Sequence, residues 1–194
     1  MRIVALVCSA RERGNCYDLA EFIIRKVRAK GAETEIINAY DYKIIPCSHC
    51  NYECFKTPKA CPICDDVPEI WMKLKAADGV ILAIPIYYGM PSALFKALIE
   101  RAQGILDWVT VEFRDLRSVW DRKVVVVLIV SNGGGRDILR LVTQQLPNAQ
   151  IVEALFSYRD YGTPGYKGDL IKLSSVQRRL QELAKRMYAY LKPI

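Results

Sequence analysis

Short apolar runs alternate with amphipathic stretches along almost the whole chain. The runs have no alternating polar face, so they predict strands that are covered on both sides. The predicted strands span residues 3–8, 35–38, 79–85, 123–131 and 150–155. Apolar residues at helical spacing lie between them and predict helices over residues 17–30, 66–77, 91–103, 135–146 and 170–191.

Buried strands linked by helices of this length form parallel strand–helix–strand units. We therefore predict an α/β fold with a doubly wound, five-stranded parallel sheet in the order 2-1-3-4-5, which fits a chain of 194 residues. The sequence contains no internal repeat and no linker rich in Gly, Ser or Pro, so we expect one domain over residues 1–194. Residues 46–66 form a cysteine-rich insertion after the second strand.

Composition and charge narrow the class of protein. Hydrophobic residues make up 52% of the chain, which excludes a disordered protein. No apolar run approaches the roughly 20 residues of a membrane span, and Met1 and Arg2 lead into a strand without a cleavage site. We therefore expect a cytoplasmic protein without a membrane partner. The net charge of +7 comes largely from helices that also carry acidic residues, and no nucleic-acid-binding motif accompanies it, so nucleic acid is not an expected partner.

The turn after the first strand has the composition of an anion site. It contains the small residue Ser9, the cations Arg11 and Arg13, Gly14 for close backbone approach, and Asn15, which we expect to cap the next helix. Free backbone N–H groups and the positive end of that helix can hold a phosphate. The alternative is an ordinary polar turn. The absence of a G-x-G-x-x-G or Walker motif argues against a site for NAD or ATP.

Two further strand ends strengthen this prediction because parallel strands direct their carboxyl ends to the same edge. The third strand ends in Tyr87 and Tyr88 between two prolines, where a flat ring could rest, although either tyrosine could instead pack in the core. The fourth strand ends in three consecutive glycines at 133–135, which allow close approach of the backbone to a ligand.

Residues 9–16, 85–101 and 131–135 resemble the NAD(P)H-dependent FMN reductase family, which has a flavodoxin-like fold. The cysteine insertion is similar to that of its iron–sulfur flavoprotein branch. The resemblance implies that the FMN phosphate is held by Ser9, Arg11, Gly14, Asn15 and Cys16. It implies that the isoalloxazine is bordered by Pro85, Ile86, Tyr87, Tyr88 and Gly89 on one side and by Ser131, Gly133 and Gly134 on the other. The family usually has a hydroxyl residue at the position of Cys16, and a thiol is a weaker hydrogen-bond donor.

Five of the seven cysteines fall within the insertion. Cys47, Cys50, Cys54 and Cys61 resemble the compact motif that binds a 4Fe–4S cluster in iron–sulfur flavoproteins, with one extra residue before Cys54. Cys47, Cys50, Cys61 and Cys64 form instead two C-x-x-C pairs of the kind that hold zinc. Unliganded cysteines are a third possibility. We favour the 4Fe–4S set because a nearby flavin gives a cluster a role, and we expect His49 to lie outside the ligand set.

These observations predict an FMN-dependent oxidoreductase with a cysteine-bound 4Fe–4S cluster, active in electron transfer. No catalytic side chain is expected, because the flavin itself carries the chemistry. The electron donor is expected to be NAD(P)H or a ferredoxin-like protein. The family resemblance implies a homodimer or homotetramer, with the tyrosine-rich segment 158–168 and Trp108 near the partner. The alternatives are an FMN or quinone reductase with a zinc-bound or metal-free cysteine loop, and a zinc-stabilised nucleic-acid-binding protein.

Overall fold

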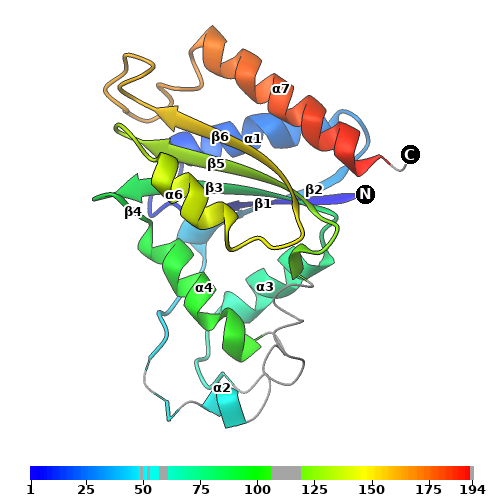
Figure 1. Cartoon of the computed structure of the whole chain (residues 1–194), viewed down its shortest axis with the longest axis vertical. Helices are drawn as coiled ribbons and strands as arrows, with labels where there is room; N and C mark the ends of the chain where they lie inside the picture. Colours follow the sequence, from blue (N-terminus) through cyan, green and yellow to red (C-terminus); the bar gives the residue numbers. More distant parts are fainter. Residues whose placement is uncertain (49, 52, 57–60, 106–118, 193–194) are drawn as a thin grey trace.

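A computed structural model describes residues 1–48, 50–51, 53–56, 61–105 and 119–192 (Figure 1). The predictions for His49 and Trp108 lie outside these residues.

A parallel sheet forms the centre of the molecule (Figure 1). Its strands are β1 (Arg2–Val7), β2 (Glu33–Asn38), β3 (Gly79–Tyr87), β5 (Val124–Ser131) and β6 (Gln150–Ser157). They are arranged in the order β2-β1-β3-β5-β6, and every neighbouring pair is parallel. This arrangement confirms the predicted order 2-1-3-4-5. All eight residues of β5 are buried, as its uninterrupted apolar sequence requires.

Helices cover both faces of the sheet and enclose two hydrophobic cores. The helices α1 (Asn15–Arg28) and α7 (Ser174–Leu191) pack on one face, while α3 (Val67–Ala76), α4 (Ala93–Ile105) and α6 (Arg136–Thr143) pack on the other (Figure 1). The 3-10 turn η1 (Ala39–Asp41) and the short helix α2 (Glu53–Lys56) belong to the connection that carries the cysteines. This connection extends away from the sheet, beyond α3 and α4 (Figure 1).

The start of α4 differs from the predicted helix over residues 91–103. Instead of beginning a helix, Pro91 pairs with Ile86 in a short strand, β4 (Met90–Pro91), which runs antiparallel to the end of β3. Tyr88 and Gly89 form the turn with φ angles of 49° and 73°. The helix starts only after Ser92, whose Oγ accepts a hydrogen bond from the N–H of Phe95 at 3.3 Å. The turn therefore projects beyond the sheet and leaves the Tyr88 side chain fully exposed.

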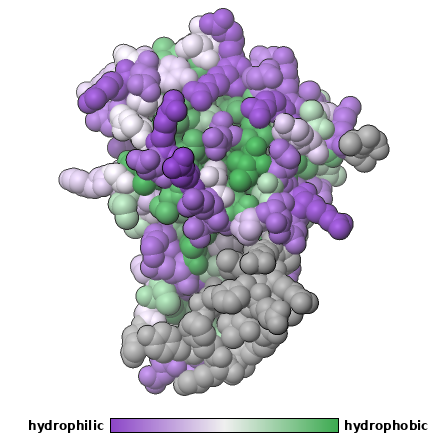
Figure 2. All heavy atoms as spheres, viewed as in Figure 1, coloured by the Kyte–Doolittle hydropathy of each residue, from purple (hydrophilic) through white to green (hydrophobic). Residues whose placement is uncertain are grey.

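Polar and charged side chains cover most of the face seen in Figure 2, and an apolar area is exposed over β6, between α6 and α7. Of the helices in the described ranges, none combines the length and the apolar character needed to cross a membrane.

Candidate functional site

A cavity of about 50 Å³ opens at the carboxyl edge of the sheet, where three segments meet. It is lined by all the residues predicted to hold a phosphate, namely Ser9, Arg11, Gly14, Asn15 and Cys16. The end of β3 contributes Pro85, Ile86 and Tyr87, and the end of β5 contributes Val130. The sheet therefore brings the first and third strand ends together, as the parallel topology predicts.

A second hollow of about 280 Å³ adjoins the first, because Ile86 lines both. Its lining includes Tyr88 and Gly89 from the β3–β4 turn, and Ser131 and Gly133 from the loop after β5. Gly134 is not among the lining residues, but its carbonyl accepts a hydrogen bond from Ser131 Oγ at 2.8 Å and so helps to fix the loop. The two hollows together extend from the turn after β1 to the turn after β5.

The amino terminus of α1 faces the first cavity with Gly14, not Asn15, as its N-cap. Within the described part of the chain no side chain caps this end of α1, so the backbone N–H groups of its first turn remain available to an anion. The predicted capping role of Asn15 is wrong because its side chain is engaged elsewhere. Its Nδ2 donates to the carbonyl of Tyr166 at 2.9 Å and to Tyr158 Oη at 3.3 Å, and its Oδ1 accepts from the N–H of Leu170 at 3.3 Å.

Tyr158 also lines the first cavity, whereas it was predicted to lie near a partner subunit. It follows β6, which continues to Ser157 rather than ending at residue 155. The position of a fifth parallel strand end at the same edge could have indicated this role. Gly165 lies against the Tyr158 ring with a φ of 82°, and a Cβ there would come within 2.5 Å of ring carbon Cδ2.

Cys16 lines this cavity, and its side chain is buried. Burial raises the pKa of Cys16 to about 12, although the nearby charge of Arg11 opposes the increase. The thiol is therefore neutral at physiological pH. It can offer a ligand only a weak S–H donor, so the stronger contacts available to an anion come from Arg11 and from the backbone.

A separate, small cavity lies in the cysteine-rich connection, next to α4. Its lining includes Cys47, Cys50, Cys54 and Cys61, together with Glu100 and Arg101. Burial and the neighbouring Cys50 raise the pKa of Cys54. Cys64 is exposed and does not line the cavity. Among the residues that the structure describes, no three histidine, cysteine or acidic side chains lie close enough together to hold a single metal ion.

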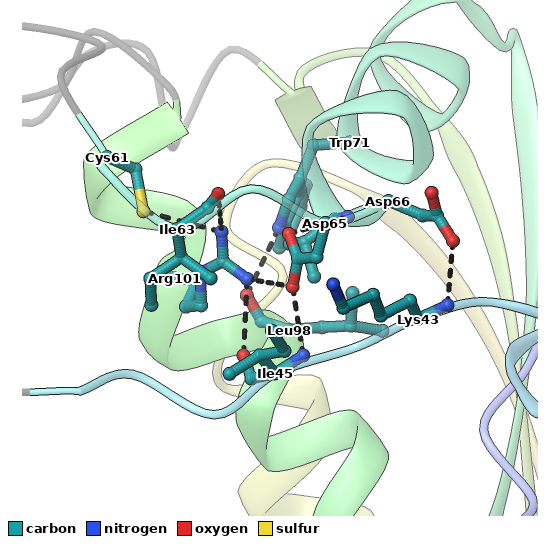
Figure 3. Close-up of polar contacts among 10 residues, drawn as sticks. Lys43, Ile45, Cys61, Ile63, Asp65, Asp66, Trp71, Leu98 and Arg101 are labelled. Carbon is teal, nitrogen blue, oxygen red and sulfur yellow. Dashed lines mark hydrogen bonds and ion pairs between the residues drawn. The ribbon is translucent and has the colours of Figure 1, made fainter.

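An ion pair buried beside this cavity joins Arg101 of α4 to Asp65, and neither side chain is exposed to solvent (Figure 3). Burial alone would raise the pKa of Asp65, but hydrogen bonds from Arg101 and from the N–H of Ile45 outweigh this effect and lower it. The carboxylate is therefore ionised. No role for Arg101 was predicted from the sequence, although its position four residues after Ala97 and three after Leu98 places it on the buried face of the helix.

The parallel sheet with this strand order and a ligand cavity at its carboxyl edge defines a flavodoxin-like protein. The sequence pattern of the NADPH-dependent FMN reductases matches residues 1–161. The chain belongs to this family, as predicted.

Two similar proteins are archaeal iron–sulfur flavoproteins. The one from Methanocaldococcus jannaschii is 40% identical over 105 residues, which cover 54% of this chain and 53% of that protein. The one from Archaeoglobus fulgidus is 36% identical over 104 residues, which cover 54% and 52%. The chain thus spans about half the length of the curated relatives it matches.

Solved structures share the fold at low sequence identity. An NAD(P)H:quinone oxidoreductase from Methanothermobacter marburgensis has a TM-score of 0.64 and 12% identity, with 100% of this chain and 97% of that chain covered. A flavodoxin from the domain Archaea has a TM-score of 0.56 and 12% identity, with both chains fully covered. These likenesses concern the fold alone.

Proposed function

We propose that this protein is an FMN-dependent oxidoreductase of the iron–sulfur flavoprotein type, with one flavodoxin-like FMN-binding domain over residues 1–194. FMN would occupy the joined hollows at the carboxyl edge of the sheet, and a 4Fe–4S cluster would bind in the cysteine-rich connection. The observation that carries the proposal is that one chain holds both an uncapped helix terminus at the strand edge and a second cavity surrounded by thiols.

The residues of the first cavity suit a phosphate. The uncapped first turn of α1 supplies backbone N–H donors and the positive end of the helix, and Arg11 adds a full positive charge. Ser9 Oγ accepts a hydrogen bond from the N–H of Arg11 at 3.2 Å and thereby shapes the loop. Since the Asn15 side chain is already engaged, we assign its contact with the phosphate to the backbone.

The residues of the second hollow suit a flat ring. Pro85, Ile86 and Tyr87 would border one side, with Tyr88 and Gly89 at the turn, and the loop with Ser131, Gly133 and Gly134 would supply the other side. Bound FMN exchanges one or two electrons and accepts hydride on its ring. The protein's part is to bind and orient the ring, and we assign no catalytic side chain.

Cys47, Cys50, Cys54 and Cys61 are our proposed cluster ligands. The rival zinc set requires Cys64, which is exposed and outside the lining of the cavity. Four thiols around one cavity suit a centre with four thiolate ligands.

Several properties of the whole protein belong to this proposal. The electron donor would be NAD(P)H or a ferredoxin-like protein, and the chain would assemble as a homodimer or homotetramer. Free cysteines are typical of a reducing compartment, which supports a cytoplasmic location. Bleaching of the bound flavin by NADPH and by reduced ferredoxin, measured separately, distinguishes the two donors.

A pair of cysteine variants tests the assignment of the cluster ligands. After purification without oxygen, Cys54→Ser should contain much less iron and acid-labile sulfide than the wild type, whereas Cys64→Ser should retain both. FMN content should be unchanged in the two variants because the flavin site is separate. Loss of the metal in Cys64→Ser but not in Cys54→Ser would support the zinc set instead.

A further inference from the structure

Arg101 connects α4 to both ends of the cysteine-rich connection (Figure 3). Its Nη1 donates to Asp65 and to the carbonyl of Ile45 at 3.2 Å. Its Nη2 donates to the carbonyl of Ile63 and to Cys61 Sγ, each at 3.3 Å. One buried guanidinium thus contacts the chain before Cys47 and the chain around Cys61.

The contact with Cys61 is distinct from the rest of this network. The carbonyls of Ile45 and Ile63, together with Asp65, already connect the two chain segments to α4 through Arg101. One Nη2 N–H instead points at the sulfur of a proposed cluster ligand, and the buried Nε–H has no hydrogen-bond partner among the described residues. A buried cation is costly to desolvate. The hydrogen bonds from Nη1 and Nη2 and the ion pair with Asp65 offset this cost next to the cysteine cavity.

We infer that Arg101 is a positioning residue that orients Cys61 and raises the reduction potential of the cluster. The inference rests on the proposed function, in which Cys61 is a cluster ligand. Reduction adds negative charge to a centre that already carries thiolates. An N–H donor to a ligand sulfur, on a cation shielded from water, stabilises the more negative state.

Asp65 has the opposite effect on the potential. Its carboxylate compensates the charge of Arg101 and is itself held by N–H groups of Ile45, at 2.9 Å, and Val67, at 3.3 Å. Removing the negative charge leaves the Arg101 cation uncompensated beside the cavity. Substitutions of Arg101 and of Asp65 should therefore shift the reduction potential of the cluster in opposite directions. An ion pair with a structural role alone would not produce opposite shifts.

The test is a redox titration of the cluster, followed by electron paramagnetic resonance, in wild type, Arg101→Met, Arg101→Lys and Asp65→Asn. In Arg101→Met, we expect the ratio of oxidised to reduced cluster at a fixed ambient potential to rise at least tenfold. For one electron, this corresponds to a decrease of about 59 mV in the reduction potential of the cluster. Arg101→Lys retains the charge and should recover part of this loss. Asp65→Asn should change the ratio the other way. Arg140→Met, which removes an exposed arginine on α6, is the control for net charge and should match the wild type.

Thermal unfolding of the metal-free proteins measures the structural role of the ion pair separately. If Arg101→Met folds but cannot retain the cluster, that result supports the positioning role. In that case the potential is measured in Arg101→Lys. The inference is overturned if Arg101→Met and Arg101→Lys carry the cluster at the wild-type potential, or if the Arg101 and Asp65 variants shift it in the same direction. A wild-type protein without iron and sulfide contradicts the proposed function itself.

Discussion

Gly165 provides a direct test of how the segment after β6 shapes the first cavity. It has a φ of 82°, and a Cβ on it would lie 2.5 Å from Cδ2 and 2.7 Å from Cε2 of the Tyr158 ring. Its carbonyl also faces Asn15 Nδ2 at 3.5 Å. In Gly165→Ala, the left-handed backbone costs about 1–2 kcal/mol, and the crowded ring adds about 1–3 kcal/mol. We therefore expect a total loss of about 2–5 kcal/mol in the free energy of unfolding.

Gly162 is the matched control because its φ is 64° and no atom of the described residues lies within 4 Å of its Cβ position. Gly162→Ala should lose only the backbone part, about 1–2 kcal/mol. Urea unfolding of the FMN-free proteins measures both values. Quenching of FMN fluorescence should show weaker binding in Gly165→Ala alone, because a displaced Tyr158 ring alters the cavity. Equal stability of the two variants would refute the argument that the ring contact matters.

Other parts of the molecule give further predictions. Iodoacetamide at pH 8, followed by mass spectrometry, should label exposed Cys64 quickly and leave buried Cys16, whose pKa is raised to about 12, unlabelled until urea is added. A hydrogen bond from Lys73 lowers the pKa of Glu35 and outweighs the opposing effect of burial. The stabilisation that ionised Glu35 contributes is therefore present above about pH 5 and is lost as the pH falls. Glu35→Gln should flatten that decline and cost under about 1 kcal/mol at pH 7, measured by urea unfolding. Ser92→Ala should destabilise the fold by about 1–3 kcal/mol in the same assay, because the Ser92 hydroxyl donates at 2.6 Å to the buried carbonyl of Cys8, the residue after β1.

Much of the fold was predictable because it follows from local patterns. The uninterrupted apolar run of β5 requires cover on both faces, and parallel topology then places the strand ends at one edge. This reasoning was sufficient to group Ser9, Ile86 and Ser131 around adjoining hollows.

Contacts between segments distant in sequence were not predictable in this way. Asn15 is a residue type that commonly caps helices, but its side chain forms hydrogen bonds with residues about 150 positions later in the chain. No local sequence pattern indicates those partners. Tyr158 and Arg101 were missed for the same reason. Only the position of Arg101 on an apolar helix face signalled a buried charge, and its partner Asp65 could be identified only in three dimensions.

The central claim is that one chain carries both FMN and a cysteine-bound 4Fe–4S cluster. The most direct test is to quantify FMN, iron, acid-labile sulfide and zinc in a single sample purified without oxygen. We expect about one FMN, four iron and four sulfide per chain, with negligible zinc. A protein with one zinc per chain and neither iron nor sulfide, or one that binds no FMN, would contradict the account.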